Sequence, residues 1–457
     1  MQENIKGTEP TLIDNLCGHF RENSQVNPAL YTRYGIKRGL RNADGTGVLV
    51  GMTRVSNVHG YIVNEGEREP IEGRLTYRGI NLYDLLNGFQ AENRFGFGEV
   101  GYLLMCGTLP GHSELEAFEH AVAESRNLPD NFTEDVLMRA PSHDIMNKLA
   151  SATLALYAYD ENPDDTSIPN VMRQGIGLIS RFPVIISHAY QAKRRYFDNA
   201  SMYLHVPDKT KSTAENILGL IRPDGQYTLE EARLLDRCLV IHAEHGGGNN
   251  SAFATRVASS SGTDTYSAIA AAVGALKGPK HGGANLKVMQ MFDDIKAHVA
   301  DWADADEVYA YLLKILRREA GDHSGLVYGM GHAVYTLSDP RAVALKEGAR
   351  PLAQEKGYVK EFNLVELVET LTPRAFAEVR GEDVKTMCAN VDLYSGLVYT
   401  MLGIPREMFT PLFATARIVG WMAHRLEEIA MGGKIIRPAY KPMRHTPKFY
   451  VPLSERP

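Results

Sequence analysis

Histidines, one aspartate and several arginines occur in glycine-marked segments in the C-terminal half of the sequence. The segments are IHAEHGGGN with His242 and His245, GPKHGGAN with His281, YGMGHAVY with His332, and NVDLYSG with Asp392. Arginines follow in SDPR (Arg341), FATARIVG (Arg417) and IIRP (Arg437). A neutral imidazole, a proton-accepting carboxylate and nearby arginines are what carbon-acid chemistry on an anionic substrate requires. The sequence therefore predicts an enzyme.

Length and composition limit the class of protein. A chain of 457 residues exceeds what one hydrophobic core usually organises, so about two or three domains are expected. Hydrophobic residues at 44% and charged residues at 23% are typical of an ordinary globular protein. The formal net charge of -6 argues against a nucleic-acid binder, because such proteins usually carry a clustered basic surface.

The cysteines and the N-terminus indicate the cellular context. Cys17, Cys106, Cys238 and Cys388 lie far apart without CxxC spacing, so we expect reduced, buried thiols and no disulfide framework. The first residues, MQENIKGTEPTLIDN, resemble neither a signal peptide nor a transit peptide. No apolar run of about 20 residues predicts a membrane span. A cytoplasmic location is the resulting expectation.

The candidate catalytic residues need secondary-structure elements to position them, and the hydrophobic periodicity of the sequence predicts mostly helices. Residues 34–80 are rich in glycine, valine and turn residues with short alternating runs, which favours strands. From Leu82 onward the periodicity is helical, with short loops between segments. We therefore expect a mostly α fold with a small N-terminal β element at about 34–80.

One helix is predicted to carry two of the histidines. Thr228 is a plausible N-cap with Glu231 as its capping-box partner, and Gly246-Gly247-Gly248 marks the end. His242 and His245 then fall on the inward face, together with Leu235 and Cys238. The alternative is that the histidines only cap helix carbonyls. A metal site is disfavoured, because HAEH is not HExxH and the sequence offers no third ligand at helical spacing.

His281 lies between two predicted helices. An alanine-rich helix stops at Gly278-Pro279 and another begins after His281, so this imidazole is near a helix N-terminus. The positive end of the helix dipole disfavours its protonation. A neutral histidine there can donate to a developing oxyanion. The alternative is a hinge with an incidental histidine.

His332 and Arg417 can also be explained by a structural role instead of a catalytic one. GMGH is weak as a nucleotide fingerprint, and a turn with a surface histidine would explain it equally. Thr410-Pro411 is expected to open the helix that carries Arg417, with Gly432-Gly433 closing it. An arginine flanking a core face most often extends to solvent or pairs with a carboxylate.

The order of these segments is more specific than any one of them. The succession HAEHGGGNNSA, GPKHGGAN, GMGHAVYTLSDPR, NVDLYSG, FATARIVGW and IIRP resembles the citrate synthase family, which condenses an acyl-CoA with a 2-oxo dicarboxylate. LTYRGINLYDLL and FGEVGYLLMCGTLPGHSELEAF are similar to that family's N-terminal region, so the resemblance covers about residues 34–440.

The resemblance implies a two-domain helical homodimer. Residues 1–282 and 404–457 would form a large domain, and residues 283–403 a small domain that closes over the active-site cleft. The activity implied is that of an acyltransferase: acetyl-CoA condenses with oxaloacetate through an enolate, and citryl-CoA is then hydrolysed to citrate and CoA. The substrate is a coenzyme A thioester, with no separate cofactor, metal, nucleic acid or membrane partner.

The resemblance also implies a role for each matching residue. His281 would hydrogen-bond the thioester oxygen, Asp392 would remove the methyl proton, and His332 would polarise the ketone of oxaloacetate. The implied oxaloacetate contacts are His245, His332, Arg341, Arg417 and, from the partner subunit, Arg437. The implied coenzyme A contacts are Leu326, Val327, Tyr328, Gly329, Met330 and Gly331.

Three positions depart from the family pattern. Gly246 stands where an acidic residue often follows the second histidine, Ala333 stands where many bacterial members have a basic residue, and Lys280 before His281 is unusual. A propionyl-CoA-using 2-methylcitrate synthase remains an alternative, because one methylene changes discrimination by only about 1–3 kcal/mol. A non-catalytic helical binding or interaction protein is the alternative from another class.

Overall fold

The computed structural model describes residues 10–42, 45–65, 67–381, 387–443 and 449–456, and the chain separates into two compact units, Met1–Gly51 and Met52–Pro457. The first unit contains α1 (Pro10–Asn23), α2 (Ala29–Arg33) and a 3-10 turn, Arg38–Leu40. None of its residues with a described side chain is buried. The strands predicted from residue 34 are wrong up to residue 55, where the described chain has only an isolated bridge between Arg41 and Gly47.

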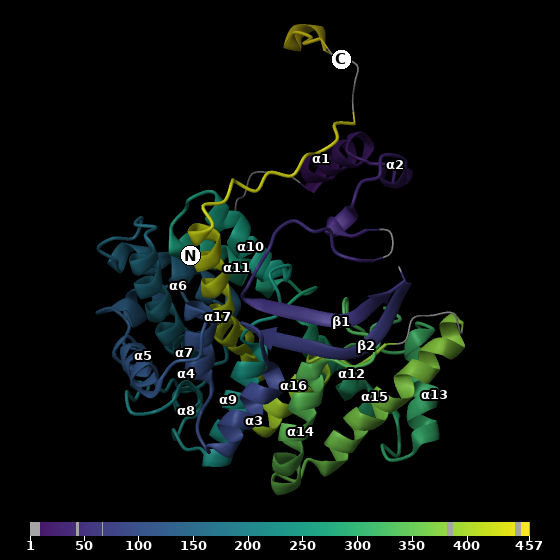
Figure 1. Ribbon diagram of the computed structural model, residues 1–457. Helices are drawn as coiled ribbons and strands as arrows, with labels where there is room; N and C mark the ends of the chain where they lie inside the picture. The colour runs from purple at the N-terminus through teal and green to yellow at the C-terminus, as the bar shows by residue number, and fades with distance from the viewer. Residues whose placement is uncertain (1–9, 43–44, 66, 382–386, 444–448, 457) are drawn as a thin grey trace. The chain divides into compact units, whose positions relative to one another are not determined.

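The second unit begins with the predicted β element. Strands β1 (Ser56–Asn64), β2 (Glu67–Tyr77) and β3 (Ile80–Asn81) form an antiparallel sheet in that order, with Ser56 opposite Tyr77 (Figure 1). Gly73 allows close packing, because a Cβ there would lie 2.2 Å from the carbonyl oxygen of Ser338. The hairpin therefore packs against the SDPR segment that carries Arg341.

Helices follow from Leu82 onward, as predicted, and the mostly α fold is confirmed. They are α3 (Leu82–Ala91), α4 (Phe97–Cys106), α5 (His112–Glu124), α6 (Ile145–Ala155), α7 (Ile168–Phe197), α8 (Thr213–Ile221), α9 (Leu229–His242), α10 (Asn250–Ser260), α11 (Thr265–Lys277), α12 (Ala284–His298), α13 (Ala305–Leu316), α14 (Pro340–Glu355), α15 (Val359–Arg380), α16 (Asp392–Met401) and α17 (Phe409–Ala430).

Helix α17 is the centre of the core. It packs against α4, α7, α9 and α10 (Figure 1). Every residue from Phe409 to Leu426 is buried. The predicted N-cap is wrong, because α17 begins at Phe409 and the Thr410 hydroxyl instead donates to the carbonyl of Gly282 at 2.9 Å. A helix buried all round has no solvent-flanking position, so Arg417 lies in the interior rather than beside a core face.

Helix α9 begins as predicted and ends early. Thr228 accepts from the backbone N–H of Glu231, and the Glu231 carboxylate accepts from the Thr228 N–H, which completes the capping box. The helix ends at His242, so the prediction that His245 continues its inward face is wrong. His245 lies in the turn before Gly246, whose φ of 87° requires a residue tolerant of the left-handed region.

Three further predictions concern the cysteines, a membrane span and the division into domains. Cys238 and Cys388 are buried as expected, but Cys17 and Cys106 are exposed. None of the described helices is long and apolar enough to span a membrane. The division into domains 1–282 with 404–457 and 283–403 stays a prediction.

Candidate active site

The end of α9 positions two buried histidines differently. The Nδ1–H of His242 donates to the carbonyl of Cys238 at 2.8 Å, so this imidazole does cap its own helix. Its ring packs edge-on against Phe413, with 4.8 Å between centroids. Burial lowers the pKa of His242 to about 3 and holds the pKa of His245 well below its usual value, so both rings are neutral near pH 7.

His245 faces the segment after His332. The centroids of the His245 and His332 rings are 5.2 Å apart, and Tyr335 stacks on His332 at 4.5 Å. Tyr335 also lies 5.7 Å from His245. The structure therefore brings together two of the histidines that the sequence predicted as substrate contacts.

The backbone fixes which nitrogen of His332 carries the proton. The N–H groups of Val334 and Tyr335 both donate to Nδ1, at 3.0 and 3.1 Å. Nδ1 is therefore an acceptor, and the neutral ring carries its proton on Nε2. Arg341 Nη2 lies 3.4 Å from that nitrogen. Because both groups are donors, the space beside them suits an oxygen that accepts two hydrogen bonds.

Arg341 is already paired with a carboxylate. Its Nε and Nη2 donate to the two oxygens of Asp339 at 3.0 and 2.7 Å, and both residues are buried. Asp339 also caps α14 by accepting from the Arg341 backbone N–H at 2.9 Å. Burial lowers the pKa of Arg341, but the adjacent charge of Asp339 outweighs it and the pKa is raised overall. The guanidinium is thus fixed before any ligand arrives.

Arg417 has unused donors. Its Nε donates to the carbonyl of His242 at 2.6 Å, and its guanidinium lies 4.7 Å from the centre of the Phe413 ring. Within the described part of the chain, its Nη1 and Nη2 have no hydrogen-bond partner, and neither does Nε2 of His245. Burial lowers the pKa of Arg417 to about 10, which leaves it charged at neutral pH. Buried polar atoms are rarely left unpaired, so these three indicate a place for an anionic ligand.

A short pairing of two segments positions Asp392. Met330 and Ala389 form an antiparallel bridge, and Asn390 N–H donates to the carbonyl of Gly329 at 2.8 Å. Asn390 then accepts from the backbone N–H of Asp392, the first residue of α16. Burial raises the pKa of Asp392 to about 6, against the opposing effect of the positive charges at Arg341 and Arg417. A carboxylate with a raised pKa is a stronger base and is still ionised at pH 7.

His281 lies in the turn before α12, as predicted, and contacts a serine that sequence reasoning did not single out. Its Nε2 lies 3.0 Å from Ser251 Oγ, which also accepts from Trp421 Nε1 at 3.1 Å and contacts Asn249 Oδ1 at 2.9 Å. Burial, assisted by the charge of Arg417, lowers the pKa of His281 to about 4. The imidazole is therefore neutral.

The serine decides which nitrogen of His281 can donate. If the Ser251 hydroxyl donates its hydrogen bond to Asn249 Oδ1, it can only accept from His281. His281 must then donate from Nε2, and its Nδ1 is left as an acceptor. If the Asn249 amide turns by 180°, its NH2 donates to Ser251, and Ser251 donates to Nε2. Nδ1–H is then the free donor. A hydrogen bond from His281 to an oxyanion requires the second arrangement.

The predicted coenzyme A segment is a glycine-containing turn beside a small cavity. Leu326 and Tyr328 line this cavity of about 220 Å³ together with Lys287 and Met291. Gly329 has a φ of 83° and a Cβ there would lie 2.9 Å from Leu393 Cα, so only glycine fits. Val327 and Gly329 are buried, Met330 and Gly331 are half-buried, and Leu326 is exposed.

Three residues with suggested roles lie on the surface of this chain. Arg437 is exposed in the segment after α17, where the neighbouring Ile436 N–H donates to Ser260 at 3.1 Å. Lys280 and Ala333 are also exposed. The structure does not bring Arg437 to the histidine cluster of its own chain.

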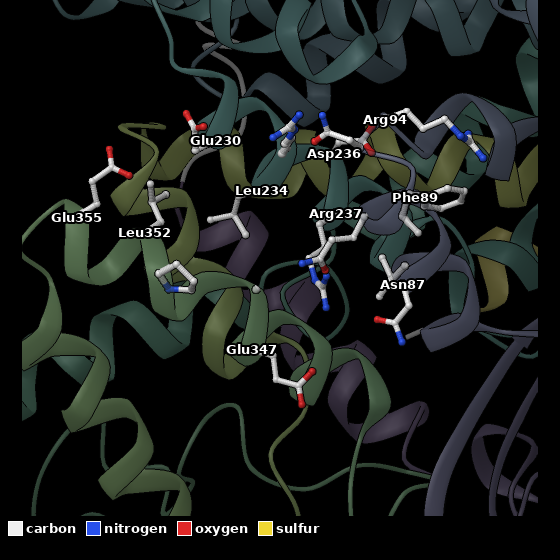
Figure 2. A pocket seen from close by; sticks show the side chains of 17 residues that line it. Asn87, Phe89, Arg94, Glu230, Leu234, Asp236, Arg237, Glu347, Leu352 and Glu355 are labelled. Carbon is white, nitrogen blue, oxygen red and sulfur yellow. The ribbon is translucent and has the colours of Figure 1, made fainter.

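A separate cavity of about 650 Å³ lies between α3, α9 and α14. Figure 2 shows Arg237, Asp236 and Glu347 among its lining side chains. It contacts α9 between Glu230 and Val240, along most of the helix before His242. None of its described lining residues is a predicted substrate contact.

Comparisons with known proteins cover most of the chain. The family model described as "Citrate synthase, C-terminal domain" matches residues 42–439. A citrate synthase of Synechocystis sp. is 32% identical over 90% of this chain and 92% of its own length. A 2-methylcitrate synthase of Shewanella oneidensis is 31% identical over 84% and 92%. A solved ternary complex of Thermoplasma acidophilum citrate synthase with carboxymethyl coenzyme A and oxaloacetate has a TM-score of 0.74 at 27% identity, covering 92% of this chain and 99% of that one.

Proposed function

The chain belongs to the citrate synthase family, and on that premise we propose that it condenses acetyl-CoA with oxaloacetate and hydrolyses the resulting citryl-CoA to citrate and CoA. One observation carries the proposal. Two buried nitrogens of Arg417 and one of His245 have no partner among the described residues, and they lie in the same site as Arg341 and His332. Oxaloacetate supplies two carboxylates and a ketone for such donors.

The proposed first step is removal of a methyl proton from acetyl-CoA by Asp392. The proton goes to the carboxylate, and the electron pair forms the carbon–carbon double bond of an enolate. The enolate oxygen accepts a hydrogen bond from Nδ1–H of His281. Since a thioester methyl is a very weak acid, a neutral donor aimed at the developing charge is the main stabilisation available.

In the second step the enolate carbon attacks the ketone carbon of oxaloacetate. Nε2–H of His332 donates to the ketone oxygen and stabilises the developing alkoxide. Arg417 and His245 bind one substrate carboxylate, and Arg341 contributes from the other side. Holding the ketone in one orientation converts a bimolecular reaction into an effectively unimolecular one. Water then cleaves the thioester, releasing CoA and citrate.

Further assignments belong to the same proposal. The turn of residues 326–331 binds coenzyme A as a substrate, and no separate cofactor is required. The protein acts as a cytoplasmic homodimer in which residues 283–403 close over the cleft. The exposed Arg437 is available to reach the site of the partner subunit.

The 2-methylcitrate synthase activity is the second candidate, because the curated relatives of the two types are 32% and 31% identical to this chain. The test is oxaloacetate-dependent release of free CoA, followed with a thiol reagent, with acetyl-CoA and separately with propionyl-CoA. A strong preference for acetyl-CoA supports the citrate assignment, and a strong preference for propionyl-CoA replaces it. Release from neither thioester by folded protein that binds oxaloacetate indicates a non-catalytic ligand-binding protein.

A further inference from the structure

Glu244 is a fully buried carboxylate directly before His245. Its Oε1 accepts from the Ser56 hydroxyl of β1 at 2.9 Å and from His424 Nε2 of α17 at 2.8 Å. Its Oε2 has no partner among the described residues and lies 2.3 Å from the position that a Cβ on Gly420 would occupy. The missing side chain of Gly420 thus makes room for this carboxylate beside α17.

His424 is neutral and therefore does not cancel the negative charge of Glu244. Arg256 Nη2 donates to His424 Nδ1 at 2.8 Å, so His424 donates to Glu244 through Nε2 as a neutral ring. The charge of Arg256 is itself matched by Glu427 and Glu428. Glu244 therefore keeps a full negative charge in the interior, held in place from two elements.

The positive charge of Arg417 lies close by on the same two segments: Arg417 is one helical turn before Gly420 on α17, and its Nε donates to the carbonyl of His242, two residues before Glu244. Both residues are fully buried, both have open atoms, and they form no ion pair with each other among the described contacts. Each still affects the other: burial raises the pKa of Glu244, but the hydrogen bond from His424 and the positive charge of Arg417 act in the opposite direction, and the pKa is lowered overall. In the opposite direction, Glu244 raises the pKa of Arg417 against the larger effect of burial.

We propose that Glu244 is the resident counter-charge of Arg417: it is a positioning residue that keeps this guanidinium charged in the empty site and offsets part of its attraction for a substrate carboxylate. The inference rests on the proposed function, in which Arg417 binds a carboxylate of oxaloacetate. A second negative charge behind the arginine repels the ligand that the arginine attracts. At an effective dielectric constant of about 20, a charge about 12 Å away changes a binding constant on the order of tenfold, and a nearer charge changes it more.

The test is the isosteric variant Glu244→Gln, with oxaloacetate binding measured by titration calorimetry. Its amide oxygen still accepts from Ser56 and His424, but the charge is gone. We expect oxaloacetate to bind about tenfold more tightly at pH 7.5, KM to fall with it, and kcat to change by less than about threefold. Glu244→Asp retains the charge and should keep wild-type affinity. Weaker or unchanged binding in Glu244→Gln overturns the proposal.

A pH profile provides a readout that a purely structural role would not change. The charged or titratable groups acting on Arg417 are Glu244, Arg341, Tyr77 and Asp392. Without Glu244, Arg417 deprotonates more easily, so the alkaline loss of oxaloacetate binding should begin at a lower pH than in the wild type. An unshifted alkaline limb contradicts the counter-charge role.

A matched control is Glu231→Gln, which removes a buried carboxylate at the other end of α9, where it pairs with Arg222 and Lys356. It should lower the melting temperature and leave oxaloacetate affinity unchanged. If Glu244→Gln alone does not fold, Arg417→Met/Glu244→Gln lacks both charges and should fold. Failure of that double variant, while Arg417→Met folds, also overturns the proposal. Absence of binding by the wild type instead rejects the proposed function itself.

Discussion

The two buried arginines of the site are held in opposite ways. Arg341 forms a two-point ion pair with Asp339 before any ligand is present, whereas among the described residues Arg417 is held through Nε and its two terminal nitrogens have no partner. Removing one partner of a buried ion pair strands the other charge, whereas Arg417 forms no ion pair among the described residues. The comparison indicates that Arg341 contributes to stability through its ion pair, whereas the open donors of Arg417 are the ones that the proposed function assigns to the ligand.

The largest expected effect tests whether Asp392, rather than either arginine, performs the chemistry. Asp392→Asn keeps the shape of the site and removes the base, so kcat should fall by about 10³-fold while the Kd for oxaloacetate changes by less than about twofold. Coupled assays and titration calorimetry measure the two quantities. Retained turnover would reject Asp392 as the base.

The same variant has a predicted effect on stability. The pKa of Asp392 is raised from 3.8 to about 6 in the folded protein, so folding favours its protonated form and stability is lost as the pH rises between those values. At pH 7 Asp392→Asn should therefore stabilise the fold by about 3 kcal/mol, seen as a higher denaturation midpoint. A lower midpoint would contradict this account of burial.

Removing Arg341, the arginine that is paired with Asp339, should reduce both stability and oxaloacetate binding. Arg341→Met leaves Asp339 as a buried charge without its partner, so the free energy of unfolding should fall by about 3–5 kcal/mol and oxaloacetate affinity should also drop. Chemical denaturation provides the first number. The double variant Arg341→Met/Asp339→Asn should recover part of the stability, and no recovery would show that packing rather than the ion pair is responsible.

Removing Arg417, the arginine with open donors, should reduce binding far more than stability. Arg417→Met removes a buried guanidinium whose terminal nitrogens have no partner in the described chain, so Kd for oxaloacetate should rise by about 100-fold. Because the variant also leaves Glu244 without its counter-charge, the melting temperature should fall, but by less than in Arg341→Met. A marked loss of stability would mean that Arg417 supports the core as Arg341 does, and the contrast between the two residues would fail.

The smallest effect is the acid limb of the pH profile. With Asp392 as the proposed base, activity depends on its ionised form, so kcat should fall about tenfold per pH unit below pH 6. His281, with a pKa lowered to about 4, and His242, at about 3, stay neutral in this range and should not contribute. An acid limb centred near pH 4 would instead indicate that Asp392 is solvated.

The sequence was most informative where the interactions are local. The capping box at Thr228 and Glu231 and the helix break around His281 are confirmed, because each depends on residues only a few positions apart. The end of α9 at His242 was missed, since the glycines after His245 indicate a turn but do not say how far the helix extends. The start of α17 was missed because Thr410 bonds to a distant carbonyl instead of capping.

The candidate site was only partly accessible to sequence reasoning. The order of segments identified the histidines, the aspartate and the arginines, and it did so through resemblance rather than spacing. Ser251 and Glu244 were not singled out as site residues, although both stand in the quoted segment HAEHGGGNNSA. Nothing local marks them, because their partners are His281 and His424, far along the chain.

By itself, the sequence determined the family, the mostly helical class and the residues with chemistry, because motif order and periodicity are written along the chain. Only the tertiary structure decided the electrostatic state of the site. It buried Arg417 within α17, gave its terminal nitrogens no partner among the residues that are described, and joined Glu244 to Ser56 and His424 across 188 and 180 residues. Burial and long-range contacts set the pKa of a group, and neither can be derived from sequence neighbours alone.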